Sequence, residues 1–152
     1  MTLRRHGRAV LPKALALHLA SLGHGRYDQT GPVDAPEGFV VSMPDTPDLA
    51  WCVYAQKGFP ALDLSGYVRP ELKVVLRLAK GSGHQAGYDR VEAIRRDLDR
   101  THQITWAAGT EHEQYVLTCD ANEPEPVYLG PDPTGRPLWS VSVQTELTKE
   151  VA

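Results

Sequence analysis

The chain has 152 residues, which is enough for one domain that buries a core without metal or disulfide support. An apolar fraction of 41%, a charged fraction of 23% and a net charge of −3 are ordinary for a globular protein. This balance excludes electrostatic steering toward nucleic acid or an anionic membrane, so we expect neither a membrane nor sequence-specific nucleic acid as a partner.

The N-terminal region combines a basic start with an apolar helix pattern. Three arginines lie in the first eight residues, which we expect to form a flexible arm: Arg4, Arg5 and Arg8. Leucines then recur at helical spacing over residues 11–22, and Pro12 suits a first helical turn. Lys13 and His18 interrupt the apolar run and no convincing cleavage site follows, so we predict a helix and not a secretory signal.

Between residues 27 and 78, strand patterns alternate with segments rich in proline and glycine. Strands are predicted at 38–43, 49–56 and 71–78, and loops at 27–36, 44–48 and 57–70. The third strand has the clearest pattern, because leucine or valine occupies every second position from Leu72 to Leu78.

Helical spacing returns over residues 85–100, where an apolar stripe that includes Val91 and Ile94 opposes several arginines. Two further strands are expected at 103–107 and 112–120. On the second of these strands, one face is expected to carry Tyr115, Leu117 and Cys119. A proline-rich loop, 121–126, follows.

The most distinctive stretch is residues 127–147, in which two strand patterns flank a rigid, proline-rich corner. The second strand alternates from Trp139 to Glu146, which is typical of a half-buried strand. The corner holds no nucleophile or base. This feature therefore favours an architectural function over catalysis, and a structural corner and a docking element are equally open interpretations of it.

The order of these elements favours an α+β fold: a single-layer antiparallel or mixed sheet with two helices on one face. No internal repeat or linker interrupts the chain, so residues 1–152 are predicted to form one domain.

No motif indicates a catalytic, cofactor or metal site. His112 and Glu113 are adjacent in an expected strand and point to opposite faces, and no further ligand stands at metal-binding spacing. The sequence Gly81-Ser82-Gly83 lacks the length and lysine of a phosphate-binding loop. Cys52 and Cys119 lie among apolar neighbours, as buried free cysteines do.

Several pieces of the chain together resemble one known family. They are an arginine, Arg77, near Gly81 at a strand end; the pair Gly87-Tyr88 at a helix start; and the turn Leu129-Gly130-Pro131-Asp132-Pro133-Thr134-Gly135-Arg136 before an alternating strand. With the early helix, they resemble the tail terminator (minor capsid) proteins of long-tailed bacteriophages over residues 11–145. Two departures are Leu78-Ala79-Lys80 between Arg77 and Gly81, and Ser142 where asparagine is frequent.

This resemblance implies a structural protein of the virion, assembled in the host cytoplasm. Such a protein forms a ring, commonly a hexamer, on the head-proximal end of the tail tube, stops tube growth and meets the head connector. Its partners are then further copies of itself, the tube protein and the connector protein.

A ring requires two different complementary patches on each subunit. Charge segregation suggests the basic arm (Arg4, Arg5, Arg8) and the acidic run 120–132 as complementary surfaces. The corner contributes three further interface candidates: Gly130, Asp132 and Arg136.

Two alternatives stay open at this point. A head-completion or connector protein would share a small α+β chain and the ring habit, and only its partner would differ. A small enzyme would assemble its site from scattered residues such as His18, Asp89 and His112, and it would show a concave pocket with perturbed titratable groups.

Overall fold

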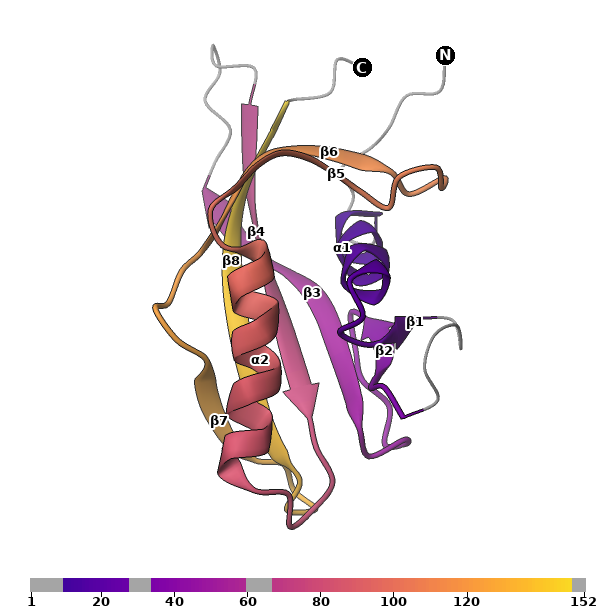
Figure 1. Ribbon diagram of the computed structural model, residues 1–152, viewed down its shortest axis with the longest axis vertical. Helices are drawn as coiled ribbons and strands as arrows, with labels where there is room; N and C mark the ends of the chain where they lie inside the picture. Colours follow the sequence, from indigo (N-terminus) through magenta and orange to yellow (C-terminus); the bar gives the residue numbers. More distant parts are fainter. Residues whose placement is uncertain (1–9, 28–33, 60–66, 149–152) are drawn as a thin grey trace.

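The computed structural model of the protein describes residues 10–27, 34–59 and 67–148 (Figure 1). In this part of the chain the helices are α1 (Val10–Ser21) and α2 (His84–Leu98). The strands are β1 (Arg26–Tyr27), β2 (Glu37–Val40), β3 (Ala50–Phe59), β4 (Tyr67–Arg77), β5 (Thr101–Trp106), β6 (Gln114–Ala121), β7 (Val127–Pro131) and β8 (Pro137–Thr148).

Strand β8 is the centre of the sheet. The strand order is β1-β2-β3-β4-β8-β6-β5, and β7 also pairs with β8. Because β8 is 12 residues long, β4 pairs along one side of it while β7 and β6 share the other side, β7 with the first half and β6 with the second. The pairs β1–β2 and β2–β3 are parallel and the other pairs are antiparallel, so the sheet is mixed.

Both helices pack on the same face of this sheet and bury one core with it. The facing side chains form rows across β3, β4 and β8, since Trp51 pairs with Leu76 and Leu76 with Trp139. The helices fill the concave side with Leu11, Leu15 and Leu19 from α1 and Val91, Ile94 and Leu98 from α2. The predicted apolar stripes of both helices are therefore buried. The exception is Leu22, which lies just past the end of α1 and is 45% exposed.

The sheet is curled into a half-barrel, and the expectation of one flat layer is corrected here. In Figure 1, β4 and β8 run behind α2 while β5 and β6 fold across one end of α1. Helix α1 contacts β5 as well as β1, β2 and β3, so the sheet wraps around it. The α+β class holds in outline, with two helices inside the curve.

The predicted loop 57–70 is wrong at both ends. Strand β3 continues to Phe59 and β4 begins at Tyr67, which leaves only residues 60–66 between them, outside the described residues. Glycine and proline normally interrupt strands, but here Pro70 lies within β4 and the pairing with β3 shifts register between Gln56 and Phe59. The irregular pairing of β3 with β4 therefore accommodates Gly58 and Pro70 within the two strands.

The face of β6 that was expected to carry Tyr115, Leu117 and Cys119 is not buried along its whole length. Tyr115 is 45% exposed, whereas its neighbours Gln114 and Val116 are buried. Cys119 is buried, as expected for that position. The buried face of this strand is set by its pairing with β5 and β8 and not by an apolar alternation of its own.

Helix α2 approaches β8 closely at Gly87, and this contact leads to a testable prediction. A Cβ atom on Gly87 would lie 2.3 Å from both Cδ1 and Nε1 of Trp139. In Gly87→Ala the gain in helix propensity, about 1 kcal/mol, is outweighed by overpacking against a rigid indole, which costs about 1–3 kcal/mol. We expect a net loss of up to about 2 kcal/mol in the free energy of unfolding, measured by urea denaturation.

The matched control is Gly83→Ala at the N-cap of the same helix. Gly83 has φ −66° and ψ 150°, which any residue adopts, and no atom lies within 4 Å of a Cβ placed there. This variant should change the stability by less than about 0.5 kcal/mol, because the entropy that alanine removes from the unfolded chain offsets its poorer capping of the helix. Equal destabilisation of the two variants would contradict the close-packing explanation.

Candidate functional site

The corner between β7 and β8 is held together by the side chain of Asp132. Its Oδ1 accepts hydrogen bonds from the backbone N–H groups of Thr134, at 3.0 Å, and Arg136, at 2.9 Å, and from the Thr134 hydroxyl, at 2.9 Å. Its Oδ2 accepts from Nε of Arg136 at 2.8 Å. Residues 132–136 thus close into a turn. Pro133 fits in it because proline has no backbone N–H group that would need an acceptor.

The same arginine ties this corner to the segment between β2 and β3. Nη1 of Arg136 donates to the backbone oxygen of Asp45, at 2.6 Å, and to Oδ1 of Asp48, at 3.1 Å. Arg77 reaches the same segment from β4 and donates to the backbone oxygens of Pro47, at 2.6 Å, and Asp48, at 3.1 Å. We call residues 45–48, Arg77, Asp132 and Arg136 the corner network.

These bonds affect the ionisation of Asp132. Desolvation opposes ionisation, but the hydrogen bonds from Arg136 and Thr134 dominate and lower the pKa of Asp132 from 3.8 to about 2. Because the folded-state pKa is depressed, the stabilisation by the carboxylate is complete above the unfolded pKa and is lost as the pH falls toward 2.

Asp132→Asn should therefore melt below the unmodified protein at pH 5–7, and this difference in melting temperature should shrink between pH 4 and 2. A difference that stays constant over this range would contradict the assignment.

The interface candidates from the sequence lie in the corner and in the N-terminal arm. Gly130 lies in a bulge of β7 with φ 91°, a left-handed conformation that suits glycine. Asp132 and Arg136 turn inward, with side chains only 10% and 9% exposed. The three arginines of the N-terminal arm, Arg4, Arg5 and Arg8, lie outside the described residues.

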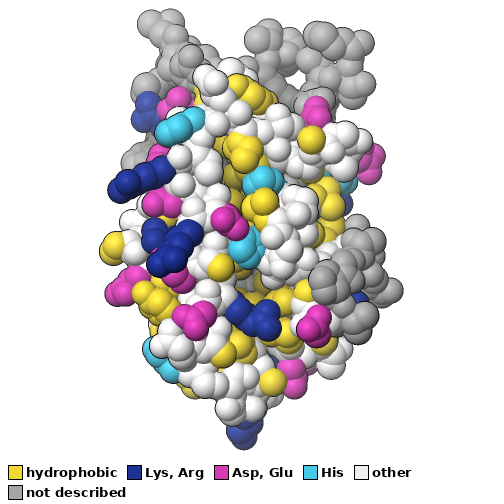
Figure 2. Space-filling view, viewed as in Figure 1, with side chains coloured by type: hydrophobic (Ala, Val, Ile, Leu, Met, Phe, Trp, Pro, Cys, Tyr) yellow, Lys and Arg dark blue, Asp and Glu magenta, His cyan; other side chains and the backbone are white. Residues whose placement is uncertain are grey.

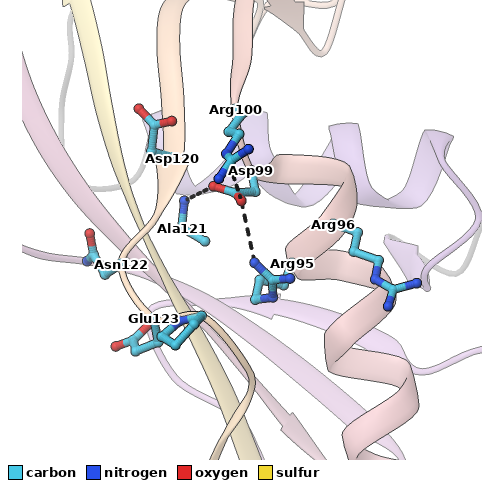
Figure 3. A pocket seen from close by; sticks show the side chains of 9 residues that line it. Arg95, Arg96, Asp99, Arg100, Asp120, Ala121, Asn122 and Glu123 are labelled. Atoms are coloured by element: carbon cyan, nitrogen blue, oxygen red, sulfur yellow. Dashed lines mark hydrogen bonds and ion pairs between the residues drawn. The ribbon is translucent and has the colours of Figure 1, made fainter.

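A polar groove of about 800 Å³ lies between the C-terminal end of α2 and the segment that follows β6 (Figure 3). Its walls carry arginines from one side and carboxylates from both: Arg95, Arg96, Arg100, Asp99, Asp120 and Glu123. Asp99 joins the two walls, since its Oδ1 accepts from the backbone N–H of Ala121 at 2.9 Å. The groove is thus a mixed-charge surface and not a site of one sign.

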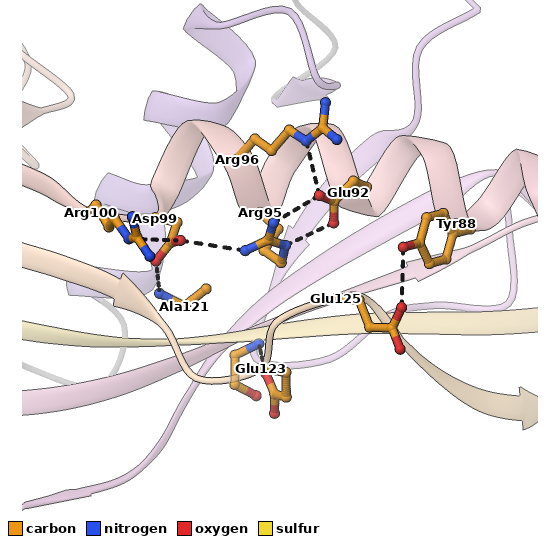
Figure 4. Close-up of polar contacts among 10 residues, drawn as sticks. Tyr88, Glu92, Arg95, Arg96, Asp99, Arg100, Ala121, Glu123 and Glu125 are labelled. Atoms are coloured by element: carbon orange, nitrogen blue, oxygen red, sulfur yellow. Dashed lines mark hydrogen bonds and ion pairs between the residues drawn. The ribbon is translucent and has the colours of Figure 1, made fainter.

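Most of these charges are already paired along α2 (Figure 4). Arg95 makes two bonds of 2.8 Å to Glu92 and a longer one of 3.4 Å to Asp99. Hydrogen bonds from Arg95, together with those from Arg96, lower the pKa of Glu92 against the effect of its desolvation. Further along, the Tyr88 hydroxyl donates to Glu125 at 3.3 Å. This network holds the loop after β6 against the helix.

Figure 2 shows the face that carries both helices. Lysine and arginine side chains alternate there with aspartate and glutamate, and apolar side chains are scattered between them. Long-range attraction to a strongly charged partner therefore finds no support on this face.

Strand β7 has a different character, because three successive apolar side chains are exposed there. The exposed fractions are 36% for Val127, 45% for Tyr128 and 42% for Leu129. Tyr128 is backed by an aromatic cluster, with its ring centroid 5.0 Å from that of Trp139 and 5.4 Å from that of His84. Exposed aromatic residues on a rigid support are typical of protein interfaces.

Comparison with known proteins adds the family. A family model described as bacteriophage tail terminator protein matches residues 18–149, which is most of the chain. The chain belongs to the bacteriophage tail terminator family. A search of curated proteins found no match. The resemblance found on sequence motifs is thereby confirmed, and with it a structural protein of the phage virion that interacts with other tail or head proteins.

The residues of the enzyme alternative lie on three different elements of this tail terminator. His18 of α1 is buried and stacks on Trp106 with 5.9 Å between ring centroids, and its burial lowers its pKa. Asp89 of α2 accepts from Gln85 at 2.6 Å, and His112 pairs with Glu111 at 3.4 Å. Each side chain is engaged with a neighbour of its own.

Two kinds of feature are absent from the described residues of the terminator. No group of three or more histidine, cysteine or acidic side chains is placed there to hold a metal ion. No helix in residues 10–27, 34–59 or 67–148 is long and apolar enough to cross a membrane.

The exposed strand β7 is the feature of the terminator that sequence reasoning missed. The sequence placed residues 127–131 in a strand, but a short run such as VYLGP does not show which faces are covered. The signal was the absence of alternation: Val127, Tyr128 and Leu129 are all apolar, which indicates either a strand covered on both faces or one awaiting a partner.

Proposed function

We propose that this protein forms a ring at the head-proximal end of the phage tail tube, where it ends tube polymerisation and joins the tail to the head connector. Its partners are further copies of itself, most simply six in a ring, together with the tube protein and a connector protein. The observation that carries this proposal is the family match over residues 18–149.

The surface of β7 supports the assembly part of the proposal. Three adjacent exposed apolar residues on one strand are typical of a surface that a partner covers on assembly. Most charges of the groove and the corner network, by contrast, are paired within the chain and stabilise the subunit.

The test combines the mass of the purified protein with the length of growing tubes. Tube protein is allowed to polymerise with and without this protein, and the tube lengths are measured by negative-stain microscopy. We expect shorter tubes with a ring at one end, and a ring mass in sedimentation. Unchanged tube lengths together with binding to the connector would indicate a head-completion or connector protein instead.

The N-terminal arm adds an electrostatic prediction to this function. We propose that Arg4, Arg5 and Arg8 contact the acidic run 120–132 of a neighbour, a contact that added salt screens. Replacing the three arginines with glutamine should weaken ring formation and reduce its dependence on ionic strength, measured by sedimentation at two salt concentrations. If ring formation and tail attachment are unchanged, the arm has no such role.

A further inference from the structure

We infer that strand β7 and the β1–β2 edge of the curled sheet are the two halves of the contact between neighbouring subunits. Strand β7 of one copy packs against the β1–β2 edge of the next, and Tyr128 enters the hollow beside Phe39. This inference rests on the proposed ring and names the surfaces that close it.

The first half of the contact is β7 itself. It pairs only with β8, so its other backbone edge has no strand beside it in the described part of the chain. The open stretch is short, because Pro126 precedes it, Pro131 ends it and a bulge at Gly130 bends it. These devices limit uncontrolled strand addition while leaving the apolar side chains available to one defined partner.

The second half is the opposite edge, at β1 and β2. Strand β1 pairs only with Glu37 and Gly38, so the second half of β2 has no strand outside it among the described residues. A hollow of about 490 Å³ lies there, lined by Arg26, Glu37, Phe39, Thr46 and Pro47. Just beyond β2, Val41 is 62% exposed, the most exposed large apolar residue in the described ranges.

The hollow combines polar and apolar groups, which fits the amphipathic side chain of a tyrosine. Its one cation and one anion neutralise each other, since Nε of Arg26 lies 2.6 Å from Oε2 of Glu37. Phe39 and Pro47 supply apolar walls. A tyrosine that brings its ring to these walls keeps its hydroxyl near polar groups, which is the usual placement of tyrosine at an interface.

The positions of the two edges fit a ring. Figure 1 shows β7 on one side of the molecule and β1 and β2 on the other. The two surfaces differ in form, one a projecting strand and the other a hollow. Contacts between unlike surfaces are heterologous and lead to a closed ring when the rotation between neighbours closes. A symmetric dimer would instead need one self-complementary patch.

The experiment is thiol cross-linking of Val41→Cys combined with Leu129→Cys in one chain, with a short bismaleimide. The native thiols are poor competitors, because Cys52 and Cys119 are buried and burial raises their pKa to about 11 and about 12. The double variant should give a ladder of covalent multimers that ends at the ring size. A mixture of the two single variants should stop at the dimer, and each single variant alone should remain uncross-linked.

A control pair combines Leu129→Cys with Tyr115→Cys, at an exposed position on β6 that belongs to neither edge. This pair should give no ladder. Rings seen by microscopy without a ladder from the edge pair, or with an equal ladder from the control pair, would overturn the edge contact and leave the proposed function standing. Dimers from Leu129→Cys alone would indicate a symmetric contact and overturn it too. If neither rings nor tube caps form with the unmodified protein, the proposed function fails and this inference fails with it.

Discussion

Replacing Arg77 with leucine is expected to lower the free energy of unfolding by about 2–4 kcal/mol. Arg77 is 4% exposed, and its guanidinium donates to two backbone oxygens of the segment between β2 and β3. Leucine keeps much of the apolar packing of the arginine stem but removes both charged hydrogen bonds, so the two carbonyls lose their partners. Urea denaturation followed by tryptophan fluorescence measures the change.

The loss of Arg77 also loosens the position of Asp48, which pairs with Arg136 at 3.1 Å. Burial, followed by repulsion from Arg136, lowers the pKa of Arg77, while the carboxylates of Asp132, Asp48 and Asp45 act in the opposite direction. The control is Lys73→Leu, on the same strand and the same side of the sheet but half-buried. Its stability should change by less than about 0.5 kcal/mol. Equal losses in the two variants would show that the corner network contributes nothing particular.

The elements with regular patterns could be predicted from the sequence alone. Strand β8 alternates from Trp139 onward, β4 alternates from Leu72, and α2 repeats its apolar stripe at helical spacing, and the apolar residues of these patterns form the core. The prediction that β8 is only half-buried is wrong for its first half, because Ser140 and Ser142 on its other face are buried as well. These patterns succeed because one face of each element is buried in the same core, so local sequence and tertiary packing demand the same residues.

Other features depend on pairings that no local pattern contains. The parallel pairing of β2 with β3 requires the segment 41–49 to cross back along the sheet, although its prolines also fit a simple turn. The buried face of β6 follows from its position between β5 and β8. The curl of the sheet arises from β5 and β6 closing over α1, which is a long-range contact.

In the corner, too, the sequence indicates the residues but not their long-range partners. Asp132 and Arg136 stand four residues apart and could be singled out from the sequence, yet Asp45 and Asp48, to which Arg136 donates, lie 91 and 88 positions earlier. The sequence therefore indicated these residues but not the contact that Arg136 makes with the segment between β2 and β3. The structure assigns their side chains to joining the corner to the segment after β2, where they stabilise the subunit beneath β7.

The second large effect concerns assembly and not stability. Tyr128→Glu should weaken association between subunits by roughly 30-fold or more, which is the size of an interface hot spot of about 2 kcal/mol. Tyr128 is 45% exposed in the isolated chain, so a glutamate there remains hydrated in the monomer. In the proposed contact the carboxylate would enter a hollow whose cation, Arg26, is already paired, and its desolvation would be uncompensated.

Tyr115→Glu is a closely matched control for this variant. Tyr115 is also a tyrosine on a strand and is also 45% exposed, but it lies on β6, away from both edges of the proposed contact. Sedimentation equilibrium compares the association constants of the two variants, and circular dichroism confirms that both remain folded. Ring formation that survives Tyr128→Glu, or is lost equally in both variants, would contradict a role for β7. Selective loss in Tyr128→Glu would show that the exposed apolar side chains of β7 stabilise the contact with the next subunit and are not required to fold the chain.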